Sequence, residues 1–216
     1  MFEKKSCVKD RKDNGDCVNV LKKVGLDELR IIYKEHIRED FPRGEHRPLF
    51  GMEKLQKAGQ YDCYGYYQED SLVAYACYIL TQNGSYALLD YFAVVPELRG
   101  KGIGSEFLRS LKGNVPAKCG VFIEAESPDS AKAEEEKETR ERRIRFYLSN
   151  GAERTNSKCL LFGVDYDILF ISGKEADSPT EQLICAVEAL YREIYGAAYG
   201  RLCKPYEAPE QNKWLK

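Results

Sequence analysis

The clearest pattern of apolar and polar positions lies between residues 88 and 112. An apolar run from Leu88 to Val95 ends at Pro96, a glycine-rich turn follows, and apolar residues then recur at helical spacing. This pattern predicts a strand, a turn and a helix that opens near Ser105. Glycines permit positive φ angles, and the first N–H groups of a helix have no partner within it. The stretch therefore predicts a binding site for an anion.

The residues before this stretch predict a strand, two helices and a meander. Residues 17–21 resemble a first strand, Asp27 is expected to cap a helix that ends before Phe41, and Gly59 stops a second short helix. Turn residues, among them an Asn-Gly pair, separate three further apolar runs, which favours antiparallel hairpins. These runs cover residues 61–68, 72–80 and 86–95.

The residues after the glycine turn predict a crossover strand at 120–125, parallel to the strand before the turn. Residues 132–143 begin a charged, solvated helix with Glu and Arg four positions apart. Two closing strands and a last helix follow. The closing strands are expected at 159–162 and 164–171, and a capping box at 178–181 opens the last helix, which ends at Gly196. That helix packs on its own chain or forms a dimer contact.

The order of elements predicts a mixed α/β fold with three parts. We expect a loose arm over residues 1–16, one domain over residues 17–172, and a helical extension with a tail over residues 173–216. With 216 residues and 43% hydrophobic content, the chain can bury a full core.

Composition removes several classes of function. A net charge of −2 offers no field that recruits nucleic acid, and no apolar run reaches the roughly 20 residues of a membrane span. Eight cysteines without a Cys-x-x-Cys pair favour reduced, mostly buried thiols in a cytoplasm over disulfides or a zinc site. The only histidines, His36 and His46, make a Ser-His-Asp or Cys-His mechanism improbable.

The spacing of the glycine turn narrows the choice of anion. The turn fits neither the Walker pattern nor the dinucleotide pattern. Arg99-x-x-Gly102-x-Gly104, preceded by Val-x-Pro-Glu over residues 94–97, resembles the acetyl-coenzyme A site of the GNAT superfamily of N-acetyltransferases. Taken alone, the turn is also compatible with a tight structural connection. A second stretch, Phe146-Tyr147 followed by Gly151, resembles the second motif of that family in the expected order.

The resemblance implies a GNAT fold with a central, mixed, mostly antiparallel sheet of six to seven strands. About four helices flank this sheet, a C-terminal helix is added, and the sheet splays at its parallel pair. The pantetheine arm of acetyl-coenzyme A would enter the gap, with a bulge near Val94 directing an N–H at the thioester carbonyl. The linking loop over residues 40–50, with His46 and Arg47, is either the place where the acceptor is chosen or a solvated connection. The cofactor-binding residues expected from the resemblance are Ala93, Val94, Val95, Arg99, Gly100, Lys101, Gly102, Ile103, Gly104, Ser105 and Tyr147.

The resemblance also implies roles in catalysis. Tyr147 matches the position whose phenol protonates the coenzyme A sulfur, although its spacing also fits a helix packing face. Three carboxylates lie on strands that would border the gap, ranked as general bases in the order Glu124, Asp90, Glu126. Pairing with an arginine such as Arg143 is the structural alternative for these carboxylates, and an ordered water could replace a single base.

These expectations describe an enzyme that moves an acetyl group from acetyl-coenzyme A to a primary amine by direct attack, without a metal. The acceptor would be a small-molecule amine or a peptide amine, and the chain a cytoplasmic monomer or homodimer without a nucleic-acid or membrane partner. The alternative is a non-catalytic module that binds or senses acyl-coenzyme A.

Overall fold

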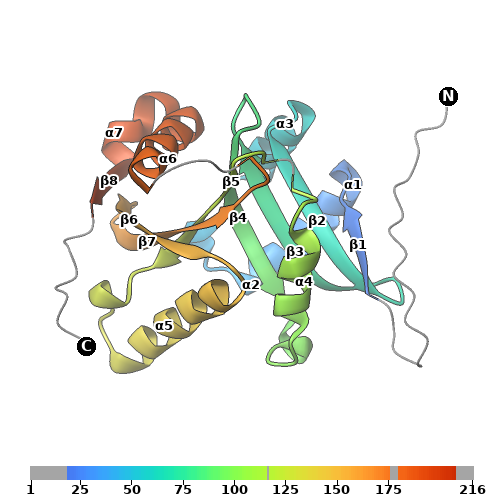
Figure 1. Cartoon of the computed structure of the whole chain (residues 1–216). Helices are drawn as coiled ribbons and strands as arrows, with labels where there is room; N and C mark the ends of the chain where they lie inside the picture. The colour runs from blue at the N-terminus through green and yellow to red at the C-terminus, as the bar shows by residue number, and fades with distance from the viewer. Residues whose placement is uncertain (1–18, 116, 176–179, 208–216) are drawn as a thin grey trace.

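In the computed structural model, residues 19–115, 117–175 and 180–207 are described, and they form one eight-stranded sheet with helices on both faces (Figure 1). The strands are β1 (Val20–Lys23), β2 (Tyr61–Gln68), β3 (Ser71–Leu80), β4 (Tyr86–Val94), β5 (Gly120–Glu126), β6 (Glu153–Leu161), β7 (Val164–Ser172) and β8 (Cys203–Glu207). Their order is β1-β2-β3-β4-β5-β7-β6-β8, and every neighbouring pair is antiparallel except β4 with β5. The sheet is thus mixed and mostly antiparallel as expected, with one strand more than the six to seven predicted.

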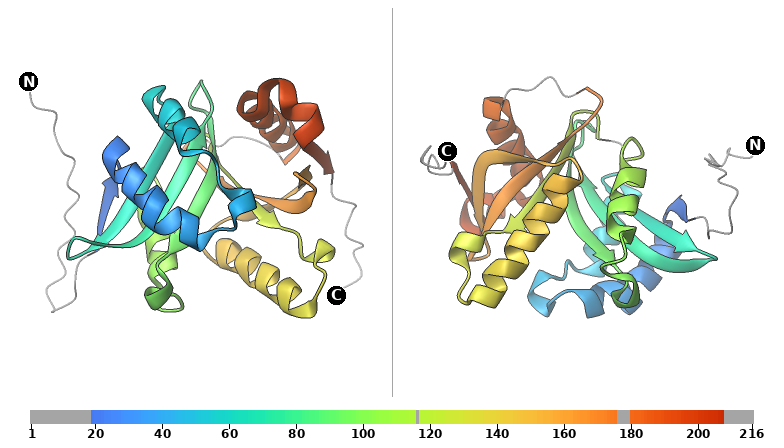
Figure 2. Two further views of the ribbon diagram at one scale, coloured as in Figure 1. Left: turned by 180° about the vertical axis from the view of Figure 1, so that it is seen from behind. Right: turned by 60° about the horizontal axis from the view of Figure 1, so that its bottom comes forward.

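Two layers of helices sandwich the sheet (Figure 2). The helices are α1 (Leu26–Ile32), α2 (Arg38–Asp40), α3 (Leu49–Lys57), α4 (Ile103–Leu111), α5 (Glu134–Ser149), α6 (Thr180–Tyr195) and α7 (Tyr199–Leu202), and a π-helical turn over Tyr33–Ile37 joins α1 to α2. Buried residues of α1, α3 and α6, such as Leu29, Met52 and Val187, share one core cluster on one face. Buried residues of α4 and α5, such as Phe107 and Ile144, belong to a second cluster on the other face. Helix α6, which the sequence predicted as the last helix, therefore packs on its own chain.

The parallel pair is joined along only part of its length. Pairing of β4 with β5 runs from Tyr86–Gly120 to Leu89–Ile123, and beyond Leu89 the strands separate. A register shift in the β3–β4 ladder leaves Asp90 as an extra residue in β4, at the place where separation begins. The expected bulge near Val94 is therefore wrong, because Val94 pairs regularly with Ala74. A bulge increases local twist and bends its strand, so the one at Asp90 directs β4 away from β5.

Several element boundaries differ from the prediction. Within the described residues the first strand is Val20–Lys23, and the expected start at Cys17 lies outside them. Strand β6 begins at Glu153, six residues before the expected start. Helix α1 starts at Leu26 after the extended Gly25, so Asp27 does not cap it. Asp27 instead lies in the first turn, where its carboxylate faces the positive end of the helix and pairs with Arg30 at 2.8 Å.

Two further corrections concern the glycine turn and the C-terminal residues. Helix α4 begins at Ile103 and not near Ser105, because Gly102 in the left-handed region ends the turn immediately before it. Residues 203–207 form the edge strand β8 on β6, although a tail was predicted from residue 204 onward. The sequence did not predict this strand because it contains Pro205, which has no N–H group. An edge strand tolerates proline because its outer side needs no N–H donor. The arm over residues 1–16 and the capping residues 178–179 lie outside the described residues.

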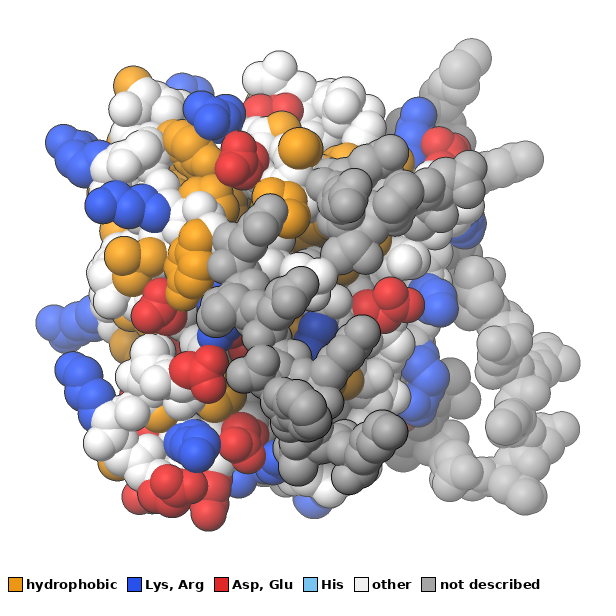
Figure 3. All heavy atoms as spheres, turned by 60° about the vertical axis from the view of Figure 1, so that its left-hand side comes forward, with side chains coloured by type: hydrophobic (Ala, Val, Ile, Leu, Met, Phe, Trp, Pro, Cys, Tyr) orange, Lys and Arg blue, Asp and Glu red, His pale blue; other side chains and the backbone are white. Residues whose placement is uncertain are grey.

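The cysteines and the surface agree with the composition. Among the described residues Cys63, Cys77, Cys159 and Cys203 are buried thiols. The Sγ atoms of Cys63 and Cys77 lie 3.0 Å apart, and those of Cys159 and Cys203 lie 3.1 Å apart. Acidic and basic side chains are interspersed on the face in Figure 3, as the small net charge suggests. Within the described part of the chain no helix is both long enough and apolar enough to cross a bilayer.

Candidate active site

A cavity of about 1070 Å³ occupies the gap where β4 and β5 separate. Its walls come from β4, β5, the glycine turn, α5, the loop before α3, and the β6–β7 turn with the end of α6. Of the site residues predicted from the sequence, most line it: Asp90, Ala93, Val94, Arg99, Gly100, Gly102, Gly104, Ser105, Glu124, Glu126 and Tyr147. Val95, Lys101 and Ile103 are not among the lining residues.

The glycine turn has the conformation that an anion loop requires. Gly100 and Gly102 have φ angles of 75° and 85°, and a Cβ built on either would meet nothing within 4 Å. These two positions therefore leave open space in front of the first N–H groups of α4, which can donate to a phosphate. A Cβ on Gly104 would meet Phe146 and Val94 at 3.4 Å, so this glycine lets α4 approach α5 and β4 closely.

Arg99 connects two parts of the cavity wall, the glycine turn and the end of α2. Its Nη2 donates to Asp40 Oδ1 at 2.6 Å, and its Nε donates to the carbonyl of Val94 at 2.9 Å. Asp40 ends α2 and also accepts a hydrogen bond from the Tyr75 hydroxyl at 2.9 Å. In this arrangement Arg99 ties the glycine turn to the loop that follows α2, while Lys101 is exposed outside the cavity.

The end of β4 presents the backbone N–H of Val94 to the gap. The N–H of Val95 donates to the carbonyl of Val73 in β3 at 3.0 Å, so it points away from β5. Successive residues of a strand direct their N–H groups to opposite edges. The N–H of Val94 therefore points toward the separated edge, where β5 no longer pairs with it.

Tyr147 lies on the inner face of α5 and lines the cavity with only 7% of its surface exposed. Its neighbours include the rings of Phe92 and Phe146, at centroid distances of 6.2 and 5.2 Å. Burial raises the pKa of Tyr147 to about 12, and the nearby Arg143 opposes this. Among the described residues nothing hydrogen-bonds its hydroxyl, so the phenol can donate to a ligand atom.

Glu124 is a carboxylate on the cavity wall with a strongly shifted pKa. It extends from β5 into the cavity, and its Oε1 accepts a hydrogen bond from the Tyr191 hydroxyl at 2.7 Å. Burial raises the pKa of Glu124 to about 7, although the hydrogen bond from Tyr191 lowers it. A carboxylate with this pKa exchanges protons readily near neutral pH.

The two other candidate carboxylates are paired with arginine. Asp90 accepts hydrogen bonds from Arg47 at 3.1 Å and from the Tyr61 hydroxyl at 2.7 Å. Glu126 lies 3.4 Å from Arg140 and 3.7 Å from Arg143. Pairing with arginine at these distances occupies the oxygens of a carboxylate. Pairing with Arg143, considered for this whole group, is found at Glu126.

The loop before α3 is fixed against β4. Besides its pair with Asp90, Arg47 donates its backbone N–H to the Tyr91 hydroxyl at 2.7 Å, and that hydroxyl donates to the carbonyl of Glu45 at 2.8 Å. Burial opposes the charge on Arg47, but Asp90 outweighs it and raises the pKa of the guanidinium. His46 hydrogen-bonds the carbonyl of Phe41 through Nε2 at 2.7 Å. The loop is therefore an ordered wall of the cavity.

Several lining residues were missed by the sequence analysis. Phe92 and Phe146 form the aromatic surface beside Tyr147, and Tyr166 and Tyr195 line the cavity from β7 and α6. The alternation of side chains between the two faces of β4 could have identified Phe92 as a lining residue. No local signal distinguishes Tyr166 or Tyr195 from the other tyrosines of the chain, because only the sheet order brings them to the gap.

The donor groups of the site favour an organic ligand with phosphates. In the described part of the chain no group of three or more His, Cys, Asp or Glu side chains is placed to hold a metal ion. The glycine turn offers N–H groups, the gap offers an unpaired strand edge, and the cavity also offers a phenol and a carboxylate. This combination can bind a phosphorylated carrier and transfer protons beside it.

Comparison with known proteins agrees with this chemistry. Residues 26–151 match the model of the acetyltransferase (GNAT) family. No curated protein matches the chain.

Solved structures share the fold. A protein assigned to the GNAT acetyltransferases from Bacteroides thetaiotaomicron has a TM-score of 0.63 at 18% identity, covering 84% of this chain and 98% of that one. One from Desulfovibrio desulfuricans, assigned likewise, has a TM-score of 0.50 at 19% identity, covering 72% and 99%. An aminoglycoside 6′-N-acetyltransferase complexed with coenzyme A has a TM-score of 0.52 at 13% identity, covering 74% and 99%. At these identities the similarity concerns the fold alone.

Proposed function

The chain belongs to the GNAT family of acetyltransferases, whose model matches more than half of it, and from this we propose that it transfers an acetyl group from acetyl-coenzyme A to a primary amine. The proposed acceptor is a small-molecule amine or the amine of a peptide, attacked directly while both substrates are bound. We also propose that residues 17–172 form the acetyltransferase domain.

One observation carries this proposal. The cavity at the separation of β4 and β5 brings together the open glycine turn, the hydroxyl of Tyr147 and the carboxylate of Glu124, whose pKa burial raises to about 7. Acetyl transfer from a thioester needs an anion site for the carrier, a donor for the developing oxyanion, a donor for the departing sulfur and a proton acceptor for the amine. Each of these groups is available on the walls of this one cavity.

The proposed chemistry assigns one step to each group. Glu124 accepts a proton from the ammonium form of the acceptor, which frees the lone pair on nitrogen to attack the thioester carbon. The N–H of Val94 donates to the carbonyl oxygen as its negative charge develops. The C–S bond then breaks, and Tyr147 gives its proton to the sulfur while it regains one from the acylated nitrogen. The products are an amide and a free thiol, and the proton on Glu124 returns to solvent.

The phosphates of coenzyme A are proposed to bind at residues 100–105 through the backbone N–H groups of the turn and of α4. Ser105 adds a hydroxyl, which accepts from Asn150 Nδ2 at 3.1 Å and is thereby held between α4 and α5. Since Arg99 is paired with Asp40, its proposed contribution is to hold the turn in place, with its positive charge still close to the diphosphate.

Release of free thiol from acetyl-coenzyme A in the presence of a panel of primary amines tests the proposal. We expect at least one amine to stimulate release. Tyr147→Phe should then lower kcat about 10-fold or more, with little change in the affinity for acetyl-coenzyme A. Tyr78→Phe is the matched control, since Tyr78 is equally buried in the same cluster but does not line the cavity.

Two outcomes would contradict this assignment. Tight binding of acetyl-coenzyme A without turnover across a broad panel of amines would favour a non-catalytic binding module. Wild-type turnover in Tyr147→Phe would remove the phenol from the mechanism while leaving the activity itself in place.

A further inference from the structure

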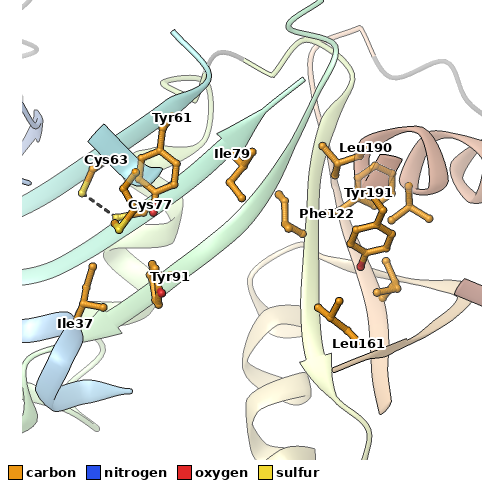
Figure 4. Packing of buried hydrophobic residues seen from close by; sticks show 14 of the residues in the cluster. Ile37, Tyr61, Cys63, Cys77, Ile79, Tyr91, Phe122, Leu161, Leu190 and Tyr191 are labelled. Atoms are coloured by element: carbon orange, nitrogen blue, oxygen red, sulfur yellow. Dashed lines mark hydrogen bonds between the residues drawn. The ribbon is translucent and has the colours of Figure 1, made fainter. Parts of the chain in front are cut away.

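Helix α6 packs against the strands that border the cavity. Its residues Leu183, Val187, Leu190 and Tyr191 follow helical spacing and are all buried in one core cluster with residues of the sheet. The side chain of Tyr191 is fully buried. Figure 4 shows it extending from α6 toward the sheet, with its hydroxyl on the side of Leu161, which is a lining residue of the cavity.

The hydroxyl of Tyr191 reaches the proposed base. It donates to Glu124 Oε1 at 2.7 Å, and no other hydrogen bond to the Glu124 carboxylate is found among the described residues. One O–H donor fixes one carboxylate oxygen and leaves the other free to accept a proton from an amine. The other groups whose charges act on Glu124, or which its charge affects, are Asp90, Arg47, Tyr166, Tyr195 and Cys203.

Four residues further along α6, Tyr195 lines the same cavity. Its ring lies edge-on to Phe162 at a centroid distance of 6.0 Å, and Phe162 belongs to the β6–β7 turn on the cavity wall. Within the described residues its hydroxyl has no hydrogen-bond partner. Because positions i and i+4 of a helix share a face, the residue that contacts Glu124 and the residue that lines the cavity are directed to the same place.

Further contacts attach α6, and the strand β8 beside it, to the sheet. Glu193 accepts the backbone N–H of Gln82 at 2.9 Å, which ties the helix to the β3–β4 hairpin. Cys203 of β8 packs against Cys159 of β6 at 3.1 Å. A side chain can fix a catalytic group only if its own position is fixed in this way.

We infer that α6 completes the acceptor end of the active site: Tyr191 is a positioning residue for Glu124, and Tyr195 is a wall against which the body of the amine lies. This inference rests on the proposed function, since it gives Glu124 the role of base. The family match ends at residue 151 and does not include α6, so the family does not imply these two roles.

The variant Tyr191→Phe tests the positioning role, because it keeps the ring in the core and removes only the O–H donor. The pH at which amine-dependent kcat/KM rises should move upward by about 0.5–1 unit, since the hydrogen bond stabilises the ionised form of Glu124. Carbon-13 NMR of labelled glutamate, assigned with Glu124→Gln, should show the same upward movement of the Glu124 pKa without needing activity.

Tyr67→Phe is the matched control. Tyr67 is also a buried tyrosine that donates to a carboxylate, that of Glu28, but it lies outside the cavity and should leave the pH profile unchanged. A pH profile and a Glu124 pKa that are unchanged in Tyr191→Phe would overturn the positioning role. Absence of amine-dependent turnover in the wild-type protein would instead remove the proposed function.

Tyr195→Ala tests the wall. We expect the KM for the amine to rise about 5-fold or more, with kcat and the KM for acetyl-coenzyme A little changed. Tyr195→Phe should restore the wild-type KM, because the contact we propose involves the ring and not the hydroxyl. A KM that is unaffected by Tyr195→Ala would overturn the assignment of α6 to the acceptor end.

Discussion

Glu124, the proposed base, illustrates how the environment that suits a proposed catalytic group can reduce stability. Burial holds its pKa at about 7, above the ordinary 4.5, so the folded protein binds more protons than the unfolded chain between these pH values. The contribution of Glu124 to stability is therefore complete below pH 4.5 and is lost as the pH rises through 7. For a shift of this size the loss is on the order of 3 kcal/mol.

Replacing Glu124 by Gln should thus separate the two properties. At pH 8 we expect the variant to be more stable than the wild type by on the order of 3 kcal/mol, and the difference should vanish as the pH falls below 4.5. Its amine-dependent turnover should fall about 100-fold or more, since a general base contributes roughly that factor. Urea unfolding at several pH values gives the first result, and thiol release gives the second. Equal stability of the two proteins at pH 8 would mean that Glu124 does not titrate near neutrality.

Gly102 is a second position where a single side chain is expected to decide a property of the protein, here the binding of coenzyme A. An aspartate there would place a carboxylate in the open space before α4 and would repel a phosphate, so Gly102→Asp should weaken coenzyme A binding beyond detection by calorimetry. Gly59→Asp is the control: Gly59 also has a positive φ, 72°, with open space around it, but it follows α3 outside the cavity. Both variants carry the same backbone strain, so only the first should lose binding. Unchanged affinity in a folded Gly102→Asp protein would move the phosphate site elsewhere.

Arg140 shows how helix α5 is attached to β5, the strand that carries Glu124. Its side chain is only 9% exposed and donates to the carbonyl of Ser127 at 2.8 Å and to Glu136 at 2.6 Å, while its Nε lies 3.4 Å from Glu126. These partners lie just after β5, at its end and in α5, so the guanidinium joins the two elements. Because the guanidinium of Arg140 is buried, it and its partners depend on one another for their hydrogen bonds.

Arg140→Met should accordingly destabilise the protein by about 3 kcal/mol, because it removes the buried guanidinium that donates to the carbonyl of Ser127 and pairs with Glu126. The same substitution at Arg145 is the control. Arg145 pairs with Glu141 on the exposed side of the same helix, and its loss should change stability by about 0.5 kcal/mol or less. Urea unfolding measures both. Similar values for the two variants would show that the buried arginine does not join β5 to α5.

Elements with strong local patterns were predictable, and those defined by distant partners were not. The run Tyr61–Gln68 and the Asn-Gly hairpin gave the meander because alternation and turn chemistry act between neighbours. The bulge at Asp90 depends on the register between β3 and β4, and β8 depends on β6, so neither leaves a local trace. The glycine turn and the Phe-Tyr motif pointed to Tyr147 and to the turn over residues 99–105, both of which line the cavity. The pair Tyr191–Glu124 joins residues 67 positions apart and becomes visible only in the folded chain.

The eight-stranded sheet consists of two half-sheets, which are joined only along the short paired stretch of β4 and β5. We call this stretch the seam. Strands β1–β4 form one half and β5–β8 the other, and pairing between the halves ends at Leu89 with Ile123. Beyond that point only side chains and the cavity lie between them. A ligand that binds in the gap contacts both halves at once, so its binding should close the open end of the seam.

Hydrogen exchange with and without coenzyme A tests this description of the molecule. Bound ligand should slow exchange at the N–H of Val94 and at Gly102 and Gly104, because these donors then have partners, while α1 and α3 should be little affected. At 100 times Kd the ligand stabilises the folded state by about 2.7 kcal/mol, which corresponds to a rise in Tm of about 5–10 °C for a chain of this size. The Gly102→Asp protein provides the control and should show neither effect. Protection spread evenly over both half-sheets, or confined to the face of α1 and α3, would contradict binding in the gap, because a ligand held there must act first on the edge that β5 leaves unpaired.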